Sequence, residues 1–87
     1  MSRSPLLALM DQKIMRILRV FLANSSAEFH LQEIAAAAKV PVATVFRIIP
    51  KLVALSLITP RLHGKMKFYQ LSSQKKNEVA RFLGGQP

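Results

Sequence analysis

A proline between two helical patterns sets the tightest limit on how this chain folds. Apolar and alanine residues recur at helical spacing over residues 31–38, which predicts a helix there. Pro41 pushes the preceding Val40 out of the helical region, so this helix ends at or before Val40. A second helical pattern follows directly after Pro41. The sequence therefore predicts two helices joined by a sharp turn, and the alanines of the first helix let the second approach closely.

The second pattern predicts a helix over about residues 42–56 with one apolar side. At 100° per residue, the apolar side carries Val45, Ile48, Ile49, Leu52 and Ser56. The opposite side carries Ala43, Arg47, Pro50 and Ala54, with Thr44 and Lys51 on one edge and Phe46 on the other. Small residues on this outward side let a helix approach the floor of a nucleic-acid groove. Arginine in such a position can contact a guanine edge or a phosphate.

Pro50 interrupts this second helical pattern. Inside a helix it removes one hydrogen bond and clashes with the carbonyl of Phe46, at a cost of roughly 3 kcal/mol. The helix either kinks there or ends near Ile49 and restarts. Because helical and core character continues after Pro50, we expect a kink.

A basic hairpin is predicted over about residues 57–71. Its strands are residues 57–62 and 67–71, joined by residues 63–66. Pro60 lacks an N–H group and therefore suits only an edge strand. Gly64 supplies the positive φ of the turn. Four basic or titratable side chains cluster around the tip of the hairpin: Arg61, His63, Lys65 and Lys67.

Two further helices flank this segment, so we expect one domain over residues 1–87. The first helix covers about residues 5–23, with a second possible start at Asp11, and the last covers about residues 73–83. A short extended segment, residues 27–30, precedes the helix at 31–38. Apolar residues beyond the core-facing stripe of the first helix predict either pairing with another subunit or burial within one subunit: Leu6, Leu9 and Val20.

The charge of the chain favours a polyanionic partner. Thirteen Lys and Arg residues face four acids, which gives a net charge of +9 and a pI of about 11.1. Nucleic acid is the most common partner of such a chain. General solubility and an anionic membrane surface are the alternatives. No apolar run is long enough to span a bilayer, so we expect no membrane segment.

The same composition argues against catalysis, metals and cofactors. The chain has no cysteine, which excludes disulfides and thiolate metal sites. Its two histidines lie far apart in the sequence with few acids nearby, so we expect no metal site. The four acids fall on separate elements, and no Gly-rich phosphate loop or paired nucleophile and base occurs. We therefore expect neither an enzyme nor a bound cofactor.

The order of these elements and four short motifs resemble winged helix-turn-helix domains of prokaryotic regulators, especially the MarR and ArsR types. The motifs are Leu31-Gln32-Glu33-Ile34-Ala35, Thr44-Val45-Phe46-Arg47-Ile48-Ile49-Pro50-Lys51-Leu52, Ser56-Leu57-Ile58-Thr59 and Tyr69-Gln70-Leu71-Ser72. The resemblance implies an α+β, mostly α fold with a small antiparallel hairpin, the wing, between N- and C-terminal flanking helices. Three residues depart from the usual pattern: Pro41, Phe46 and Pro50. The Cys and His ligands of ArsR-type metal sensors are missing.

The resemblance implies sequence-dependent binding of double-stranded DNA by a small dimeric transcriptional regulator in the cytoplasm, associated with the nucleoid. The homodimer would form through the first helix, alone or with the C-terminal helix. Candidate DNA contacts are Ala43, Thr44, Phe46, Arg47, Lys51, Arg61, His63, Lys65 and Lys67. For the charged residues the alternative is a solvated side chain, and for Ala43 and Thr44 it is ordinary helix-start chemistry. Phe46 either inserts near bases or packs against Phe68 of the wing or a neighbouring subunit.

Other functions fit the same residues. One is a DNA-binding protein of replication or partition, or a coat without sequence preference. Another is a protein–protein interaction module in which Val42 and Phe46 form the docking face. RNA binding is a third alternative, although nothing resembles a stacking platform for single strands.

Overall fold

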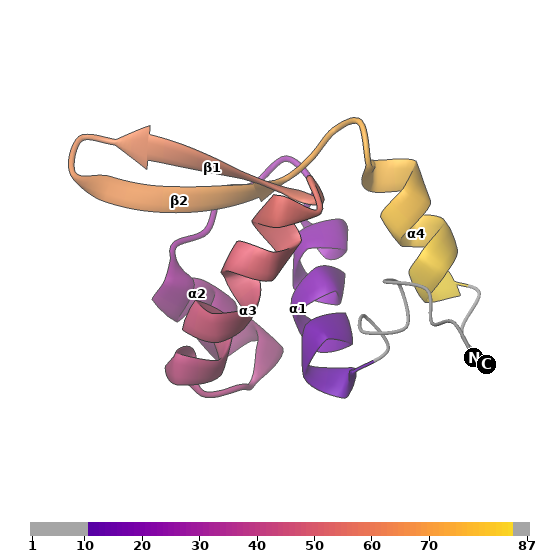
Figure 1. Cartoon of the computed structure of the whole chain (residues 1–87), viewed down its shortest axis with the longest axis horizontal. Coiled ribbons are helices and arrows are strands. Elements are labelled where there is room, and N and C mark those ends of the chain that lie inside the picture. Colours follow the sequence, from indigo (N-terminus) through magenta and orange to yellow (C-terminus); the bar gives the residue numbers. More distant parts are fainter. Residues whose placement is uncertain (1–10, 85–87) are drawn as a thin grey trace.

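Four helices and one antiparallel hairpin make up the computed structural model, which describes residues 11–84 (Figure 1). The elements are α1 (Gln12–Ala23), α2 (Leu31–Ala38), α3 (Val42–Ala54), β1 (Ile58–His63), β2 (Met66–Leu71) and α4 (Lys76–Gly84). The hairpin projects from one side of the helices, and α4 lies on the far side of α1. This mostly helical α+β architecture confirms the predicted fold class. No helix within residues 11–84 has the length and apolar character to cross a bilayer.

Helix α1 begins at its second predicted start. The Asp11 carboxylate accepts hydrogen bonds from the backbone N–H groups of Lys13 (2.7 Å) and Ile14 (3.4 Å), which makes Asp11 the N-cap. At the other end, Asn24 donates its side-chain amide to the carbonyl of Val20 (3.1 Å). The predicted residues 5–10 of this helix, including Leu6 and Leu9, lie outside the described residues.

The core forms where α1, α2 and α3 meet the base of the hairpin. Phe21 of α1 is completely buried and packs edge-on against Phe29, with ring centroids 5.5 Å apart. Val20, which the sequence left open, is partly buried and packs against this core. The largest fully buried side chains are Phe21, Ile17, Leu18, Ile34, Ile49, Leu52, Ile58 and Val45.

The turn between α2 and α3 is set by two residues with non-helical backbones. Lys39 closes α2 in the left-handed conformation, with φ of 60°. Pro41 is extended, with φ of −61° and ψ of 145°, and its carbonyl accepts the first hydrogen bonds of α3, from Thr44 (3.0 Å) and Val45 (3.2 Å). The sharp turn predicted from Pro41 is therefore present. At the start of α2, the Glu33 carboxylate accepts the backbone N–H of His30 (3.1 Å).

Helix α3 runs through Pro50 without ending, so the predicted alternative of a break near Ile49 is wrong. Pro50 lies on the exposed side. The predicted apolar side is buried at Val45, Ile48, Ile49 and Leu52. Ser56 is the exception, because the helix ends at Ala54 and Ser56 is an exposed residue with φ of 63°.

The hairpin turn is tighter than predicted. Gly64 and Lys65 alone connect the paired residues His63 and Met66, and Gly64 has φ of +64°. A positive φ at the first of two loop residues is typical of the type II′ turn, which matches the twist of the flanking strands. The predicted strand ends at 62 and 67 therefore each extend by one residue towards the turn.

Pro60 fits the hairpin because of how β2 is bonded on its other side. The segment before α2 forms a single bridge, in which Phe29 and Tyr69 exchange backbone hydrogen bonds of 2.8 and 2.7 Å. The N–H and carbonyl of Tyr69 thus point towards Phe29, and the Pro60–Tyr69 pair between β1 and β2 is not a hydrogen-bonded one. The nitrogen of Pro60 consequently faces the open edge of β1, where a missing N–H costs nothing.

Helix α4 begins later than predicted. Residues 73–75 form a turn, in which the N–H of Lys75 donates to the carbonyl of Ser72 (3.1 Å), and the helix starts at Lys76. Val79 and Leu83 are buried, and α4 packs on α1. This packing places α4 on the side of α1 away from the hairpin (Figure 1).

The burial of Phe21 gives a test of the core. Phe21→Ala should lower the free energy of unfolding by about 3–5 kcal/mol, because it leaves a cavity in the buried core. This is a large part of the roughly 5–15 kcal/mol typical of a domain. Urea unfolding followed by circular dichroism would measure it. Phe46→Ala is the matched control: its side chain is 69% exposed, so its change should stay within about 0.5 kcal/mol. Equal losses in the two variants would contradict this core.

Candidate nucleic-acid interface

All four acids of the chain have partners within the fold. Asp11 caps α1, Glu33 contacts His30, and Glu78 lies 3.6 Å from Lys75. Glu28 contacts both Arg61 (3.6 Å) and His63. Within residues 11–84, no acid lies within ion-pair distance of ten cations: Lys13, Arg16, Arg19, Lys39, Arg47, Lys51, Lys65, Lys67, Lys76 and Arg81. The positive charge of the chain is thus left to face solvent or a partner.

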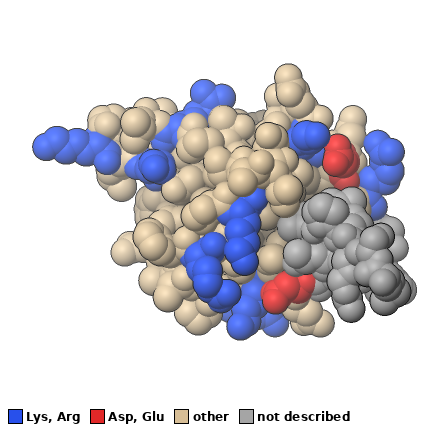
Figure 2. Space-filling view, in the orientation of Figure 1, with Lys and Arg blue, Asp and Glu red and all other residues tan. Residues whose placement is uncertain are grey.

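Some of the Lys and Arg side chains without ion-pair partners lie over α3, and others lie at the end of the hairpin. Figure 2 shows Lys and Arg side chains in the middle of the face that carries α3, and others at the far end of the projecting hairpin. Arg47 and Lys51 line a groove between α3 and the start of α1, with Lys13 and Ile14 on its other side. Asp11 also lines this groove, so the groove itself is not purely basic.

The outward side of α3 matches the predicted one except at Thr44. Ala43, Phe46, Arg47 and Lys51 are exposed, as a contact surface requires. Thr44 is only 8% exposed, because the buried arc of α3 extends past Ile48 to include it. The buried side chain offers little surface to a partner, and a nucleic-acid contact by Thr44 stays a prediction.

The predicted packing of Phe46 against Phe68 is wrong. Phe46 is 69% exposed, whereas the half-buried ring of Phe68 packs edge-on against His63 and His30, with ring centroids 5.1 and 5.9 Å away. The two histidines thus pack against the Phe68 ring, where Phe46 was expected as one alternative. The side chain of Phe46 is left projecting from the exposed part of α3.

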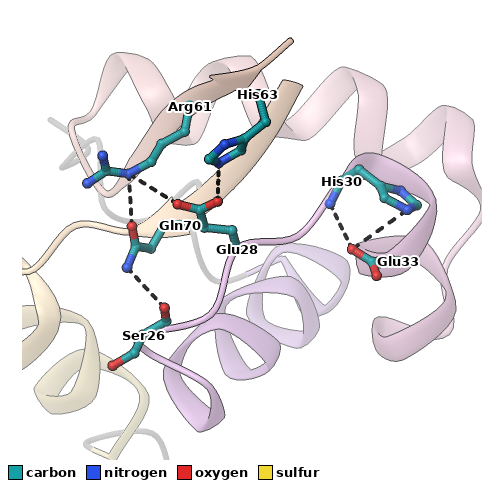
Figure 3. A network of polar contacts seen from close by, with 7 residues as sticks. All are labelled: Ser26, Glu28, His30, Glu33, Arg61, His63 and Gln70. Carbon is teal, nitrogen blue, oxygen red and sulfur yellow. Dashed lines mark hydrogen bonds and ion pairs between the residues drawn. The ribbon is translucent and has the colours of Figure 1, made fainter. Parts of the chain in front are cut away.

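A polar network along one face of the hairpin joins it to the segment before α2 (Figure 3). The Arg61 guanidinium donates from Nε to the side-chain oxygen of Gln70 (3.0 Å), and Gln70 donates to the backbone carbonyl of Ser26 (3.2 Å). The Glu28 carboxylate lies between His63 and Arg61, as an ion-pair partner of both. Arg61 and His63 are half-exposed, so each is held by the fold while keeping a solvent-facing part.

Glu28 is the residue of this surface that sequence reasoning missed. The alternation of side chains along a strand carried a signal. Phe29 bridges Tyr69, and the Phe29 side chain packs against the core. Glu28, the residue before Phe29, therefore points to the other face of the sheet. Arg61 and His63 lie on that same face. The missing information was the pairing itself, because Glu28 and His63 are separated by 35 residues in the sequence.

Lys65 and Lys67, unlike Arg61 and His63 of the same hairpin, have no contact with Glu28. Both are exposed, Lys65 lies in the turn, and neither has an ion-pair partner among the described residues. Two apolar side chains lie beside them, Leu62 at 68% and Met66 at 53% exposed. The tip therefore combines free cations with exposed apolar groups. Within residues 11–84, no three His, Asp or Glu side chains gather as metal ligands would.

Comparison with known proteins identifies the fold. No protein-family model and no curated protein sequence matches this chain. A crystal structure of an Archaeoglobus fulgidus protein matches with a TM-score of 0.74 at 20% identity, covering 93% of this chain and 91% of that one. A MarR family transcriptional regulator from Silicibacter pomeroyi matches with a TM-score of 0.70 at 20% identity over 87% of this chain. This chain spans 52% of that regulator's length.

A third structure carries the fold's name. It is the homodimeric winged helix-turn-helix DNA-binding domain of a possible ArsR-family transcriptional regulator from Mycobacterium bovis, with a TM-score of 0.59 at 21% identity. It covers 97% of this chain and 82% of that one. The chain has the winged helix-turn-helix fold. Within this fold, α3 occupies the position of the helix named the recognition helix, and the hairpin occupies the position of the wing. The resemblance to MarR and ArsR regulators that the motifs indicated is confirmed at the level of the fold.

Proposed function

We propose that this protein binds double-stranded DNA as a small homodimeric transcriptional regulator in the cytoplasm, associated with the nucleoid. The observation that carries the proposal is the placement of charge. Every Asp and Glu has a partner within the fold, while Arg47 and Lys51 of the recognition helix and Lys65 and Lys67 of the wing have no ion-pair partner within residues 11–84. A duplex is a regular array of negative charge that can meet both groups at once. The similar structures are described as transcriptional regulators, which supports a binding role without catalysis.

In this proposal the recognition helix enters the major groove and the wing lies along the flanking backbone. Arg47 contacts a base edge or a phosphate, and Lys51 contacts phosphate from the edge of the helix. Ala43 is small and exposed, so it allows the start of α3 to approach the groove floor. In the wing, Lys65 and Lys67 contact phosphates, and Arg61 and His63 contribute from positions that Glu28 and Gln70 fix.

Charge-matched variants test this surface. Arg47→Ala should weaken duplex binding by about 1–3 kcal/mol, and Lys65→Ala should lower the slope of log affinity against log salt by about 1. Lys76→Ala removes the same charge from an exposed position on α4 and should change affinity least. Fluorescence anisotropy titrations at several salt concentrations would measure all three. Equal behaviour of the three variants would mean that binding is only a response to net charge.

Glu28 gives a second test, in the direction of tighter binding. Glu28→Gln removes the one acid that contacts the wing, so phosphates no longer compete with it for Arg61 and His63. We expect a severalfold gain in duplex affinity and a steeper salt dependence. Glu78→Gln on α4 makes the same change in net charge and should have little effect. A loss of affinity in Glu28→Gln would instead show that holding Arg61 and His63 in place matters more than the charge.

The homodimer is the finer part of the proposal, and charge sets how it should respond to salt. The exposed side of α1 carries Lys13, Arg16 and Arg19, and α4 exposes Lys76 and Arg81. A symmetric contact through these helices brings like charges together, and salt screens that repulsion. Dimerisation should therefore strengthen from 0.1 to 0.5 M salt, whereas DNA binding should weaken. Sedimentation equilibrium at about these salt concentrations would measure the dissociation constant of the dimer. A dimer that weakens with salt would exclude an interface through α1 or α4.

A second candidate function is DNA binding without sequence preference, as in a coat or a protein of replication or partition. It is favoured by the few polar side chains on the outward side of α3, where Arg47 and Lys51 alone carry charge. Selection of bound duplexes from a random pool distinguishes the two functions. A regulator enriches one motif, with half-sites about 10–10.5 bp apart if it binds as a two-fold dimer. A coat enriches none.

A further inference from the structure

Phe46 is an exposed aromatic side chain that the fold does not need. It is 69% exposed, although the recognition helix around it is well packed on its inner side. The ring of Phe68, which was expected as one possible cover for Phe46, packs against His63 and His30. A large apolar group left on a basic surface indicates a contact that the isolated chain does not make.

The position of Phe46 divides the outward side of α3 into two edges. Val42, which is 47% exposed, lies one turn before Phe46, and the two form an apolar edge. Arg47 and Lys51 form a basic edge about 100° or more further round the helix. The basic edge borders the groove shared with the start of α1, so the apolar edge lies on the side of α3 away from that groove. Ala43 lies between the edges and leaves the backbone accessible.

A partner of this helix must offer negative charge to one edge and an apolar group to the other. The DNA major groove does so in one way: its walls are phosphates, and the only apolar group on its floor is the C5-methyl of thymine. A protein partner would need acids and an apolar pocket at the same spacing. The surrounding free cations favour the polyanion.

We propose that Phe46, supported by Val42, recognises thymine through contact with its C5-methyl group in the major groove. This inference rests on the proposed DNA binding and adds to it the base that the helix prefers. Phe46 is then a specificity-determining residue, while Arg47 and Lys51 hold the helix against the backbone. Because the contact is apolar, it contributes a preference that salt does not screen.

Uracil in place of thymine tests this contact directly, because it keeps the base pair and removes only the methyl group. The duplex would be the best sequence recovered from the random-pool selection, made with thymine or with uracil throughout. The full-length protein should bind the uracil duplex about fourfold more weakly for each methyl contacted. Phe46→Ala should bind the thymine duplex more weakly and show a thymine-to-uracil affinity ratio near one.

Leu62→Ala is the matched control, since Leu62 is 68% exposed but lies on the wing. It should keep the wild-type thymine-to-uracil ratio, and circular dichroism should show all three proteins equally folded. The inference is overturned if the wild-type protein binds the two duplexes equally, or if Phe46→Ala keeps the wild-type ratio. Equal binding combined with unchanged affinity of Phe46→Ala would indicate a protein partner for Phe46. If the wild-type protein binds no duplex at all, the proposed function fails together with this inference.

Discussion

The burial of one side of α3 is the constraint on which the rest of the molecule depends. Val45, Ile49 and Leu52 are almost completely inaccessible to solvent, and they belong to one buried cluster with residues of α1 and α2, among them Phe21 and Ile34. A helix fixed by so wide a buried arc cannot rotate about its axis without exposing apolar side chains to water. The direction in which its outward side chains point is therefore decided by the core, not by the surface. The fold presents Phe46 and Arg47 outwards because it buries their neighbours.

The features that local periodicity dictates were predictable from the sequence. The spacing over residues 31–38, the backbone restriction before Pro41 and the Gly64 turn each act within a few residues, and each appears in the structure. Pro50 shows the limit of such reasoning: its local cost allowed a break in the helix, whereas α3 is continuous through Pro50 and its opposite side is buried. The expected kink at Pro50 stays a prediction. Residues 1–10, where part of the predicted first helix falls, lie outside the described range.

The parts of the site that could not be predicted depend on contacts between distant residues. Thr44 looked like an edge residue at 100° per residue, but the width of the buried arc depends on how closely α2 and α1 approach. Phe68 was one of the groups expected to cover Phe46. Instead, the bridge between Phe29 and Tyr69 brings His30 to Phe68, and the pairing of β1 with β2 brings His63 to it. Pairings of this kind follow from tertiary structure, and no sequence pattern of period 2 or 3.6 encodes them.

The contacts of Glu28 contribute more to the position of the hairpin than to the stability of the fold. Ion pairs as exposed as those of Arg61 and His63 contribute about 0–1 kcal/mol, so the network adds little to the stability of the fold. The network joins the segment between α1 and α2 to a hairpin that projects from the helices. Because Gln70 ties the same strand to Ser26, two neighbouring points of the hairpin are fixed relative to the helices. A negative charge on a basic surface also weakens attraction to a polyanion, so the contacts that fix the angle of the wing to α3 reduce that attraction.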